Sequence, residues 1–201
     1  MSEQSILIVG LGNPGPQYAK TRHNAGFIAL DYFAALMGQE IAIEKMKGLY
    51  CSFQMAGRKV FLLKPQDYMN RSGECVSLFM RYFNLSPDAM LVVHDDLDLA
   101  PGRLKIVTGG GSGGHNGIRS LITHVGRSDF ARFKLGIGHP RDNSATAAMP
   151  VERFVLSRFA DTEWQLFQEN LALVEEGIRL FIEEGSAVAM NRVNRKPAPP
   201  S

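Results

Sequence analysis

A histidine at the start of a predicted helix is the first residue that could do chemistry. His23 lies in the segment TRHNAG (21–26), just before an apolar pattern at helical spacing. A helix N-terminus disfavours imidazolium, so the ring is expected to be neutral and able to accept a proton near pH 7. A carboxylate from another strand end could hold its tautomer, as in a catalytic triad that lacks the serine. On this segment alone, a histidine that caps its own helix is the simpler interpretation.

Carboxylates gather in the segment HDDLD (94–98), directly after the apolar run 91–93. Alternate residues at a strand end point the same way, and carboxylates are ligands for Mg²⁺. No second acidic cluster and no nearby histidine pair completes a coordination shell. We therefore expect no metal, and a strand-end turn in which one acid pairs with a neighbour.

The segment GLGNPG (10–15) matches the dinucleotide-binding pattern GxGxxG after an apolar run. That pattern requires a helix to begin at its third glycine, so that the helix N-terminus meets a pyrophosphate. Here Pro14 and Pro16 bracket Gly15, and the helical pattern begins only near His23. We therefore expect no nucleotide cofactor.

The segment GGSGG (110–114) matches the pattern GxSxG of serine esterases. Ser112 would be the nucleophile, with Asp129 and His139 as the acid and the base. However, five glycines surround the serine, which is more than a tight nucleophile turn requires. A loop whose backbone N–H groups cradle a ligand fits this composition better.

Three asparagines lie beside glycines or predicted helix starts, at positions 13, 70 and 116. Asn70 stands in DYMNRSG (67–73), next to an aromatic ring and just before a helical pattern. Asparagine at such places often serves a turn or a helix cap. Three of them, together with a histidine at a helix start, indicate a polar site.

The composition is typical of a globular protein with one core. Of the 201 residues, 45% are hydrophobic and 21% are charged. No apolar run approaches the roughly eighteen residues of a membrane span, and the N-terminus lacks the basic lead and apolar core of a secretory signal. Cys51 and Cys75 have no metal-ligand spacing and predict buried, reduced thiols. We expect a cytoplasmic protein with no membrane association.

Charge is distributed unevenly along the chain. Residues 99–160 hold nine Lys or Arg against three acids, a net charge of +6, whereas residues 161–185 hold seven acids against Arg179, a net charge of −6. Such asymmetry is compatible with one face offered to a polyanion, and equally with two ordinarily solvated faces.

Strands and helices are expected to alternate along the chain. Helical spacing predicts helices at 24–37, 72–83, 116–125 and 161–184, and apolar runs predict strands at 6–10, 41–45, 49–55, 59–64, 91–93, 104–107 and 133–138. Residues 142–150 are expected to form a loop. This order predicts a single-domain, three-layer α/β/α sandwich over residues 1–194 around a mixed, largely parallel, twisted sheet. The tail 195–201 is expected to be disordered.

In such sheets, ligands bind outside the carboxyl ends of strands. Three polar segments directly follow predicted strands, at 10–24, 94–98 and 109–117. We therefore expect them to meet at one edge of the sheet.

Five blocks of the sequence together resemble bacterial-type peptidyl-tRNA hydrolases. The blocks are GLGNPGPQYAKTRHNAG (10–26), KPQDYMNRSG (64–73), HDDLDLAPG (94–102), GGGSGGHNG (109–117) and FKLGIGHP (133–140). The resemblance covers most of residues 5–158. It implies a monomeric α/β sandwich that hydrolyses the ester joining a peptide to the 3′ end of tRNA without a cofactor, and so recycles tRNA from prematurely released peptidyl-tRNA.

The resemblance also implies roles for the residues at matching positions. It makes His23 the catalytic base, oriented by Asp95, and Asn13 the residue that distinguishes N-blocked peptidyl-tRNA from free aminoacyl-tRNA. The implied contacts to the terminal nucleotide and the peptide are Tyr18, Tyr68, Asn70 and Asn116, with Met69 and His115 lining the cleft. The family clamps tRNA phosphate with basic residues. Here Lys134 stands where an arginine is common, and Arg103 and Lys105 are expected to substitute for a lysine that Val107 replaces.

The expected reaction is attack of water on the ester carbonyl. His23 takes the proton, and an amide donor, with Asn70 as the first choice, holds the oxyanion. The glycine-rich loop and the helix start at Asn116 are expected to receive phosphates of the tRNA end through N–H groups. Basic residues between Arg103 and Arg158 are expected to bind the tRNA backbone. Two rival interpretations remain, a serine esterase that uses Ser112 and an RNA-binding module without catalysis.

Overall fold

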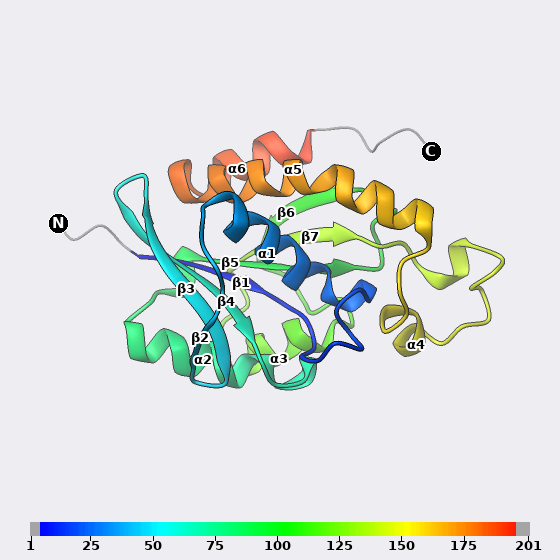
Figure 1. The fold of residues 1–201 in the computed structure, drawn as a ribbon, viewed down its shortest axis with the longest axis horizontal. Coiled ribbons are helices and arrows are strands. Elements are labelled where there is room, and N and C mark those ends of the chain that lie inside the picture. Colours follow the sequence, from blue (N-terminus) through cyan, green and yellow to red (C-terminus); the bar gives the residue numbers. More distant parts are fainter. Residues whose placement is uncertain (1–4, 196–201) are drawn as a thin grey trace.

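Seven strands form one mixed sheet in the computed structural model, which describes residues 5–195 (Figure 1). The strands are β1 (Ile6–Gly10), β2 (Ile43–Lys45), β3 (Gly48–Met55), β4 (Arg58–Pro65), β5 (Met90–Asp96), β6 (Leu104–Thr108) and β7 (Ala131–Gly136). Their order across the sheet is β2-β3-β4-β1-β5-β7-β6. The predicted α/β class and mixed sheet are confirmed.

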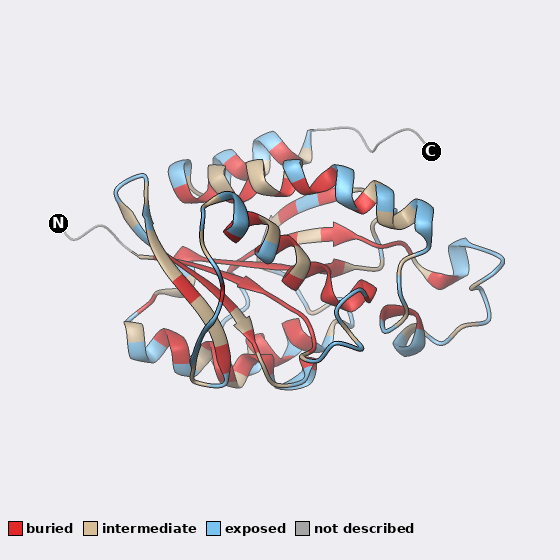
Figure 2. Cartoon of the chain, viewed as in Figure 1, coloured by how far each residue is buried: buried red, intermediate tan, exposed pale blue. Residues whose placement is uncertain are grey.

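The four central strands β4, β1, β5 and β7 are parallel. The edges are antiparallel, because β3 returns beside β4, β2 beside β3, and β6 beside β7. β1 is buried along its whole length, and Figure 2 shows the same burial in the neighbouring central strands. Strands covered on both faces need continuous apolar runs, which explains why 6–10 and 91–93 lack alternation.

Helices cover both faces of the sheet. On one face, α1 (Ala25–Leu36), α5 (Asp161–Glu184) and α6 (Ser186–Asn194) enclose the larger apolar core. On the other face, α2 (Ser72–Phe83) and α3 (Asn116–Val125) enclose a second core. The short helix α4 (Val151–Val155) packs beyond the end of the sheet in a small cluster of its own. The three predicted layers are therefore present.

The predicted bounds of α2, α3 and α5 agree with the structure. The helix predicted at 24–37 is shorter, and the 3-10 helix η1 (Arg22–Asn24) precedes it. The strand predicted at 133–138 begins and ends two residues earlier, because Ala131 and Arg132 pair with β5 and β6. Neither α4 nor α6 was expected from the sequence.

Gly26, in the first turn of α1, lets this helix approach the strand ends. A Cβ atom at this position would lie 2.3 Å from the carbonyl oxygen of Val93 and 2.6 Å from the backbone nitrogen of Leu11. A side chain would therefore push α1 away from β1 and β5. Since His23 lies two residues before this helix, in η1, the close approach also places its ring beside the end of β5.

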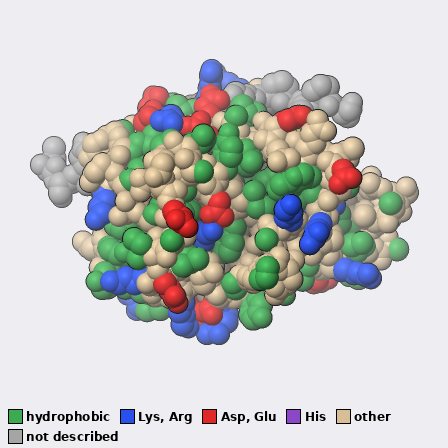
Figure 3. All heavy atoms as spheres, in the orientation of Figure 1, with side chains coloured by type: hydrophobic (Ala, Val, Ile, Leu, Met, Phe, Trp, Pro, Cys, Tyr) green, Lys and Arg blue, Asp and Glu red, His purple; other side chains and the backbone are tan. Residues whose placement is uncertain are grey.

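The acidic stretch 161–185 forms α5 and its C-cap glycine. In Figure 3, acidic side chains lie along the top of the view, where Figure 1 places α5, and Lys and Arg are interspersed with them. Ion pairs such as Glu175–Arg179 and Glu176–Arg192 balance part of this charge. α5 covers the face of the sheet opposite α3, so the acidic stretch is separated from the glycine-rich segment by the sheet.

No helix in the described part of the chain has the length and hydropathy needed to span a membrane. Cys51 and Cys75 are buried and unpaired, as predicted. Of the tail predicted to be disordered, residues 196–201 lie outside the described residues.

Candidate active site

A cleft of about 430 Å³ opens at the carboxyl ends of β1 and β5. Eighteen residues line it, from the segments after these strands, the glycine-rich loop, η2 (Met69–Arg71) and α4. The predicted meeting of the three polar segments at one place is confirmed. Six of the expected site residues beyond His23 and Asp95 are among the lining residues: Asn13, Tyr68, Met69, Asn70, His115 and Asn116.

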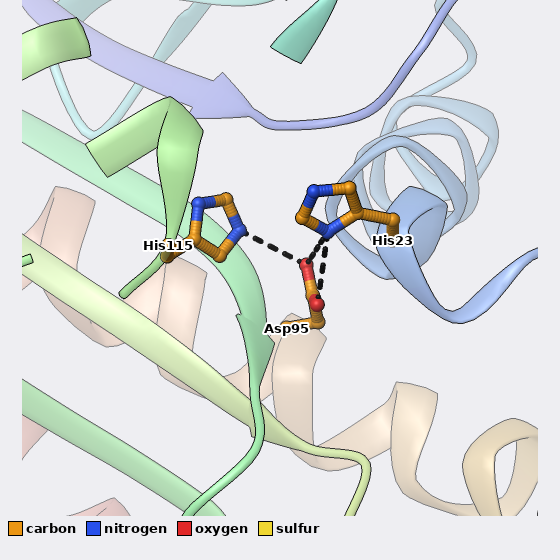
Figure 4. A group of neighbouring side chains, drawn as sticks. All are labelled: His23, Asp95 and His115. Atoms are coloured by element: carbon orange, nitrogen blue, oxygen red, sulfur yellow. Dashed lines mark hydrogen bonds and ion pairs between the residues drawn. The ribbon is translucent and has the colours of Figure 1, made fainter. Parts of the chain in front are cut away.

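His23 and Asp95 meet in this cleft, as the sequence predicted. The Nδ1 atom of His23 lies 3.0 Å from both carboxylate oxygens of Asp95 (Figure 4). A carboxylate accepts hydrogen bonds, so Nδ1 carries the proton and the lone pair of His23 is on Nε2. No side-chain cap is formed at the start of α1. The alternative of a histidine that caps its own helix is therefore wrong.

His115 holds Asp95 from the other side. Its Nε2 atom lies 3.0 Å from one carboxylate oxygen, and its Nδ1 atom accepts hydrogen bonds from the backbone N–H groups of Gly117 and Ile118. Because Nδ1 is an acceptor, His115 is neutral and its proton is on Nε2. Asp95 thus accepts a hydrogen bond from one ring nitrogen of each of two histidines.

The pKa values reflect this arrangement. Burial lowers the pKa of His23, but the charge of Asp95 and the hydrogen bond to it outweigh burial, so the pKa is raised above its usual value. The helix start was expected to disfavour the charged ring, but the Asp95 carboxylate favours that form and has the larger effect on the pKa of His23. Burial would raise the pKa of Asp95, yet its histidine partners hold it well below the usual range.

His94 fixes the backbone beside Asp95. Its Nδ1 atom lies 2.6 Å from the carbonyl oxygen of Asp95, and its ring meets that of His115 edge-on at 4.8 Å between centroids. Complete burial keeps the pKa of His94 well below its usual value, so this ring stays neutral. Its role is to position the backbone of Asp95, and it does not change its protonation state.

Asn13 is held by three hydrogen bonds. Its backbone N–H donates to Oδ1 of Asn24 at 2.9 Å, and its carbonyl accepts from Nδ2 of Asn24 at 3.0 Å. Its own Oδ1 accepts the backbone N–H of Met69 at 2.8 Å. Since Oδ1 is engaged, the Nδ2 amino group is what Asn13 offers to a ligand in the cleft.

The other predicted contact residues differ in position. Asn70 and Tyr68 are exposed at the cleft, and Asn116 accepts a hydrogen bond on Oδ1 from Arg119 at 3.3 Å. Tyr18 does not line the cleft. It lies in the turns that lead to Thr21, whose hydroxyl donates to the Tyr18 carbonyl.

The glycine-rich loop reaches the cleft by an unexpected route. β6 is antiparallel to β7, so Thr108 ends beside Ala131, at the edge of the sheet remote from the cleft. The loop then runs back, and buried Arg132 donates to the carbonyl oxygens of Gly110, Gly111 and Ser128 at 2.6–2.9 Å. Arg132 thereby fixes the loop that carries Ser112 to Asn116 to the cleft.

The start of α3 is not a free anion site, contrary to expectation. The N–H groups of Gly117 and Ile118 already donate to His115. They can donate hydrogen bonds to a phosphate only if the His115 ring moves away.

The basic residues expected to clamp phosphate lie outside the cleft lining. Lys134 pairs with Asp96 at 2.7 Å, and Asp96 is itself a lining residue. Arg103 donates to the carbonyl of Asn194 at the end of α6. Lys105 is exposed on β6, directly opposite Lys134 in the sheet. Lys105 and Lys134 are thus cross-strand neighbours.

The serine esterase arrangement is not formed. Asp129 pairs with Arg127 at 2.8 Å, and His139 caps its own 3-10 helix through Nδ1. Ser112 lines the cleft, but the nearest histidine in sequence, His115, has both ring nitrogens engaged. Asp129 and His139 do not line the cleft with Ser112, so the three residues of the serine esterase interpretation are not brought together.

The statement that no histidine pair lies near the acidic cluster is wrong. His23, Asp95 and His115 each offer one ligand atom, these atoms lie within 4.8 Å of one another, and the three residues form a group that could hold a metal ion. The ring nitrogens that contact Asp95 are Nδ1 of His23 and Nε2 of His115. A metal needs lone pairs on these nitrogen atoms. Here both atoms carry the protons that bind Asp95, so the hydrogen bonds account for the cluster.

Two buried residues beside His23 were missed by sequence reasoning. Asn24 positions Asn13, and Arg22 reaches across to the segment after α4. Arg22 also pairs with Glu163 in the first turn of α5. The only available signal was their place next to the candidate base, where polar residues preceded an apolar helix.

Buried, oriented titratable groups in a cleft at the carboxyl ends of parallel strands are typical of the active site of an α/β enzyme. A family model described as peptidyl-tRNA hydrolase matches residues 7–200. Among similar curated proteins, the peptidyl-tRNA hydrolase of Moorella thermoacetica is 43% identical over 94% of this chain and 97% of its own. That of Marinobacter nauticus is 42% identical over 99% of this chain and 100% of its own.

A solved structure gives the same result. The crystal structure of peptidyl-tRNA hydrolase from Acinetobacter baumannii superposes with a TM-score of 0.88, at 38% identity, and the match covers 99% of this chain and 98% of that one. The chain therefore belongs to the peptidyl-tRNA hydrolase family.

Proposed function

We propose that this protein hydrolyses the ester between the peptide and the 3′-terminal ribose of peptidyl-tRNA, with His23 as the general base. The observation that carries this mechanism is the pair of 3.0 Å contacts between Nδ1 of His23 and Asp95. They leave Nε2 as the basic atom of a ring that lines the cleft.

The reaction follows from this tautomer. Nε2 of His23 takes a proton from water as the water oxygen attacks the ester carbonyl carbon. The tetrahedral intermediate collapses, the bond to the ribose oxygen breaks, and the imidazolium returns the proton to that oxygen. Asp95 stabilises the imidazolium by charge, a role that fits the raised pKa of His23. The products are a peptide carboxylate and a free tRNA 3′ end.

Two amides are assigned different tasks. Asn70 is exposed at the cleft and able to turn toward the carbonyl, so it remains the first choice for the oxyanion. Asn13 is held with its amino group available to a ligand. That group can donate to the acyl carbonyl of an N-blocked substrate, whereas the free ammonium of aminoacyl-tRNA offers it no acceptor.

Substrate selectivity tests the proposed activity. Purified protein should release N-acetyl-amino acid from its tRNA about 10- to 100-fold faster than free amino acid, in line with the cost of an unpaired donor. The measurement is kcat/KM for both substrates on the same tRNA. Equal rates would remove the role of Asn13, and binding of tRNA without any release would favour the rival RNA-binding module.

The pH dependence of kcat/KM should report the His23 titration. The reaction needs the neutral ring, so the rate should fall about tenfold per pH unit below its pKa. Because Asp95 raises that pKa, the midpoint of the acid limb should lie above the usual histidine value of about 6.5. A flat profile between pH 5 and 8, or a midpoint below the usual value, would contradict this base.

We further propose that the protein acts as a monomer with one catalytic domain, in the cytoplasm, where translation produces peptidyl-tRNA. The support is that one chain provides His23, Asp95 and His115 together. Lys105 and Lys134, opposite each other in the sheet, are the basic residues that we assign to tRNA phosphate, with a salt-dependent affinity.

A further inference from the structure

One wall of the cleft comes from α4, which carried no expectation from the sequence. Val151, Glu152, Val155 and Leu156 all line the cleft. On a helix these positions share one side, whereas Arg153 points away and Phe154 is buried in the small cluster beyond the sheet. α4 thus presents an apolar strip with a single carboxylate.

Arg22 holds this wall in place relative to His23. Its guanidinium donates to the Ser157 hydroxyl and the Arg158 carbonyl, both at 2.6 Å, and lies over the Phe154 ring at 4.2 Å. The backbone N–H of Arg22 also donates to the Ser157 carbonyl at 3.1 Å. The distance from α4 to the catalytic base is therefore set by the residue adjacent to that base.

The cleft is too small for a folded RNA, so only the groups next to the ester bond enter it. α3 contributes Arg119 and Asn116 on the side of His115, whereas α4 contributes Glu152 on the side of His23. Phosphates are attracted to the first side and repelled from the second. Glu152 is exposed, and none of the ion pairs among the described residues involves it.

The apolar part of this wall also suits a peptide. Leu156 remains 42% exposed, although it is a large hydrophobic residue in a cleft. Ligand clefts are lined mainly by apolar side chains, and peptide side chains offer groups that match Val151 and Leu156. A ribose-phosphate chain does not.

Resting on the proposed function, we propose that the peptide of the substrate runs along α4, and that Glu152 makes the enzyme favour a basic residue next to the ester-linked one. Glu152 attracts a lysine side chain at that position and repels a glutamate. The tRNA leaves the cleft on the opposite side, past Arg119.

Two substrates on one tRNA test this subsite. N-acetyl-lysyl-alanyl-tRNA and N-acetyl-glutamyl-alanyl-tRNA share the RNA and the ester and differ only in the charge of the second residue. For the wild-type protein, kcat/KM should be about three- to tenfold higher for the lysyl substrate, as expected of exposed charge pairs. The ratio should approach one in Glu152→Gln and invert in Glu152→Lys.

Glu184→Lys is the matched control, because Glu184 is exposed at the end of α5 and does not line the cleft. It makes the same charge change and should keep the wild-type ratio. A ratio that Glu152→Lys leaves unchanged would overturn the subsite. So would an equal rise for both substrates in Glu152→Lys alone, since α4 would then face RNA. Wild-type protein that cleaves neither substrate would instead overturn the proposed function, and the subsite with it.

Discussion

Changing His23 to alanine is expected to lower kcat/KM for N-acetylated aminoacyl-tRNA by about 10²- to 10⁴-fold, the usual contribution of a general base. The variant would lose the ring that lines the cleft, and with it the Nε2 atom that the hydrogen bonds between Nδ1 and Asp95 leave available as a base. The affinity for product tRNA should change little, because His23 carries no permanent charge. The measurement is turnover together with tRNA binding on the same preparation.

Added imidazole should restore part of the activity of His23→Ala. The vacated space faces the cleft, and Asp95 remains oriented by His115. His139→Ala provides a matched histidine control, because His139 lies outside the cleft and is the base that a serine esterase would need. Its activity should equal that of the wild type. If instead His139→Ala is inactive and His23→Ala is active, the histidine–water mechanism is wrong.

Changing Asp95 to asparagine is expected to lower kcat by about 10³- to 10⁴-fold, as a tautomer reversal does in the serine proteases. His115 must donate from Nε2, because its Nδ1 accepts from Gly117 and Ile118. The amide oxygen at position 95 is therefore held by His115, and the amide NH₂ takes the place of the second carboxylate oxygen, 3.0 Å from Nδ1 of His23. The NH₂ group donates to the lone pair of Nδ1, so the proton of His23 moves to Nε2, which can then no longer take a proton from water.

A double variant separates this tautomer effect from loss of the negative charge. In Asp95→Asn with His115→Ala, the amide is free to turn its oxygen toward His23 and restore the productive tautomer. Activity should rise above that of Asp95→Asn alone, after allowance for the effect of His115→Ala by itself. The acid limb of the remaining activity should also lie at lower pH, because the carboxylate no longer raises the pKa of His23. If the double variant is no more active than Asp95→Asn, His115 does not hold the amide in the unproductive orientation.

Local signals predicted most of the fold. The bounds of α2, α3 and α5 follow from apolar residues at helical spacing and from end signals such as Asn84, which has the left-handed φ of 52°. β1 and β5 follow from uninterrupted apolar runs. α4 was missed because five residues are too few for a periodic pattern, and it is held by contacts with the rest of the chain, such as that of its Phe154 ring with Arg22.

The site was predicted only in part, for a related reason. The residue types at positions 13, 23, 70, 95 and 116 were visible, because polar groups at strand ends interrupt apolar patterns. The direction of β6 was not visible, because the residue pattern of a short strand is the same whether it pairs in parallel or antiparallel. Consequently the route of the glycine-rich loop, and the buried Arg132 that holds it, appear only in the folded chain.

The sequence by itself determined the chemistry available to this protein: an imidazole, a carboxylate and several amides, each after a strand or before a helix. The tertiary structure alone decided how they act. Asp95 accepts hydrogen bonds from two histidines, which sets the tautomer of His23 and raises its pKa. His115 donates from Nε2 because its Nδ1 accepts the backbone N–H groups at the start of α3. Proton positions depend on distances of about 3 Å between residues far apart in the chain, which spacing along a sequence does not encode.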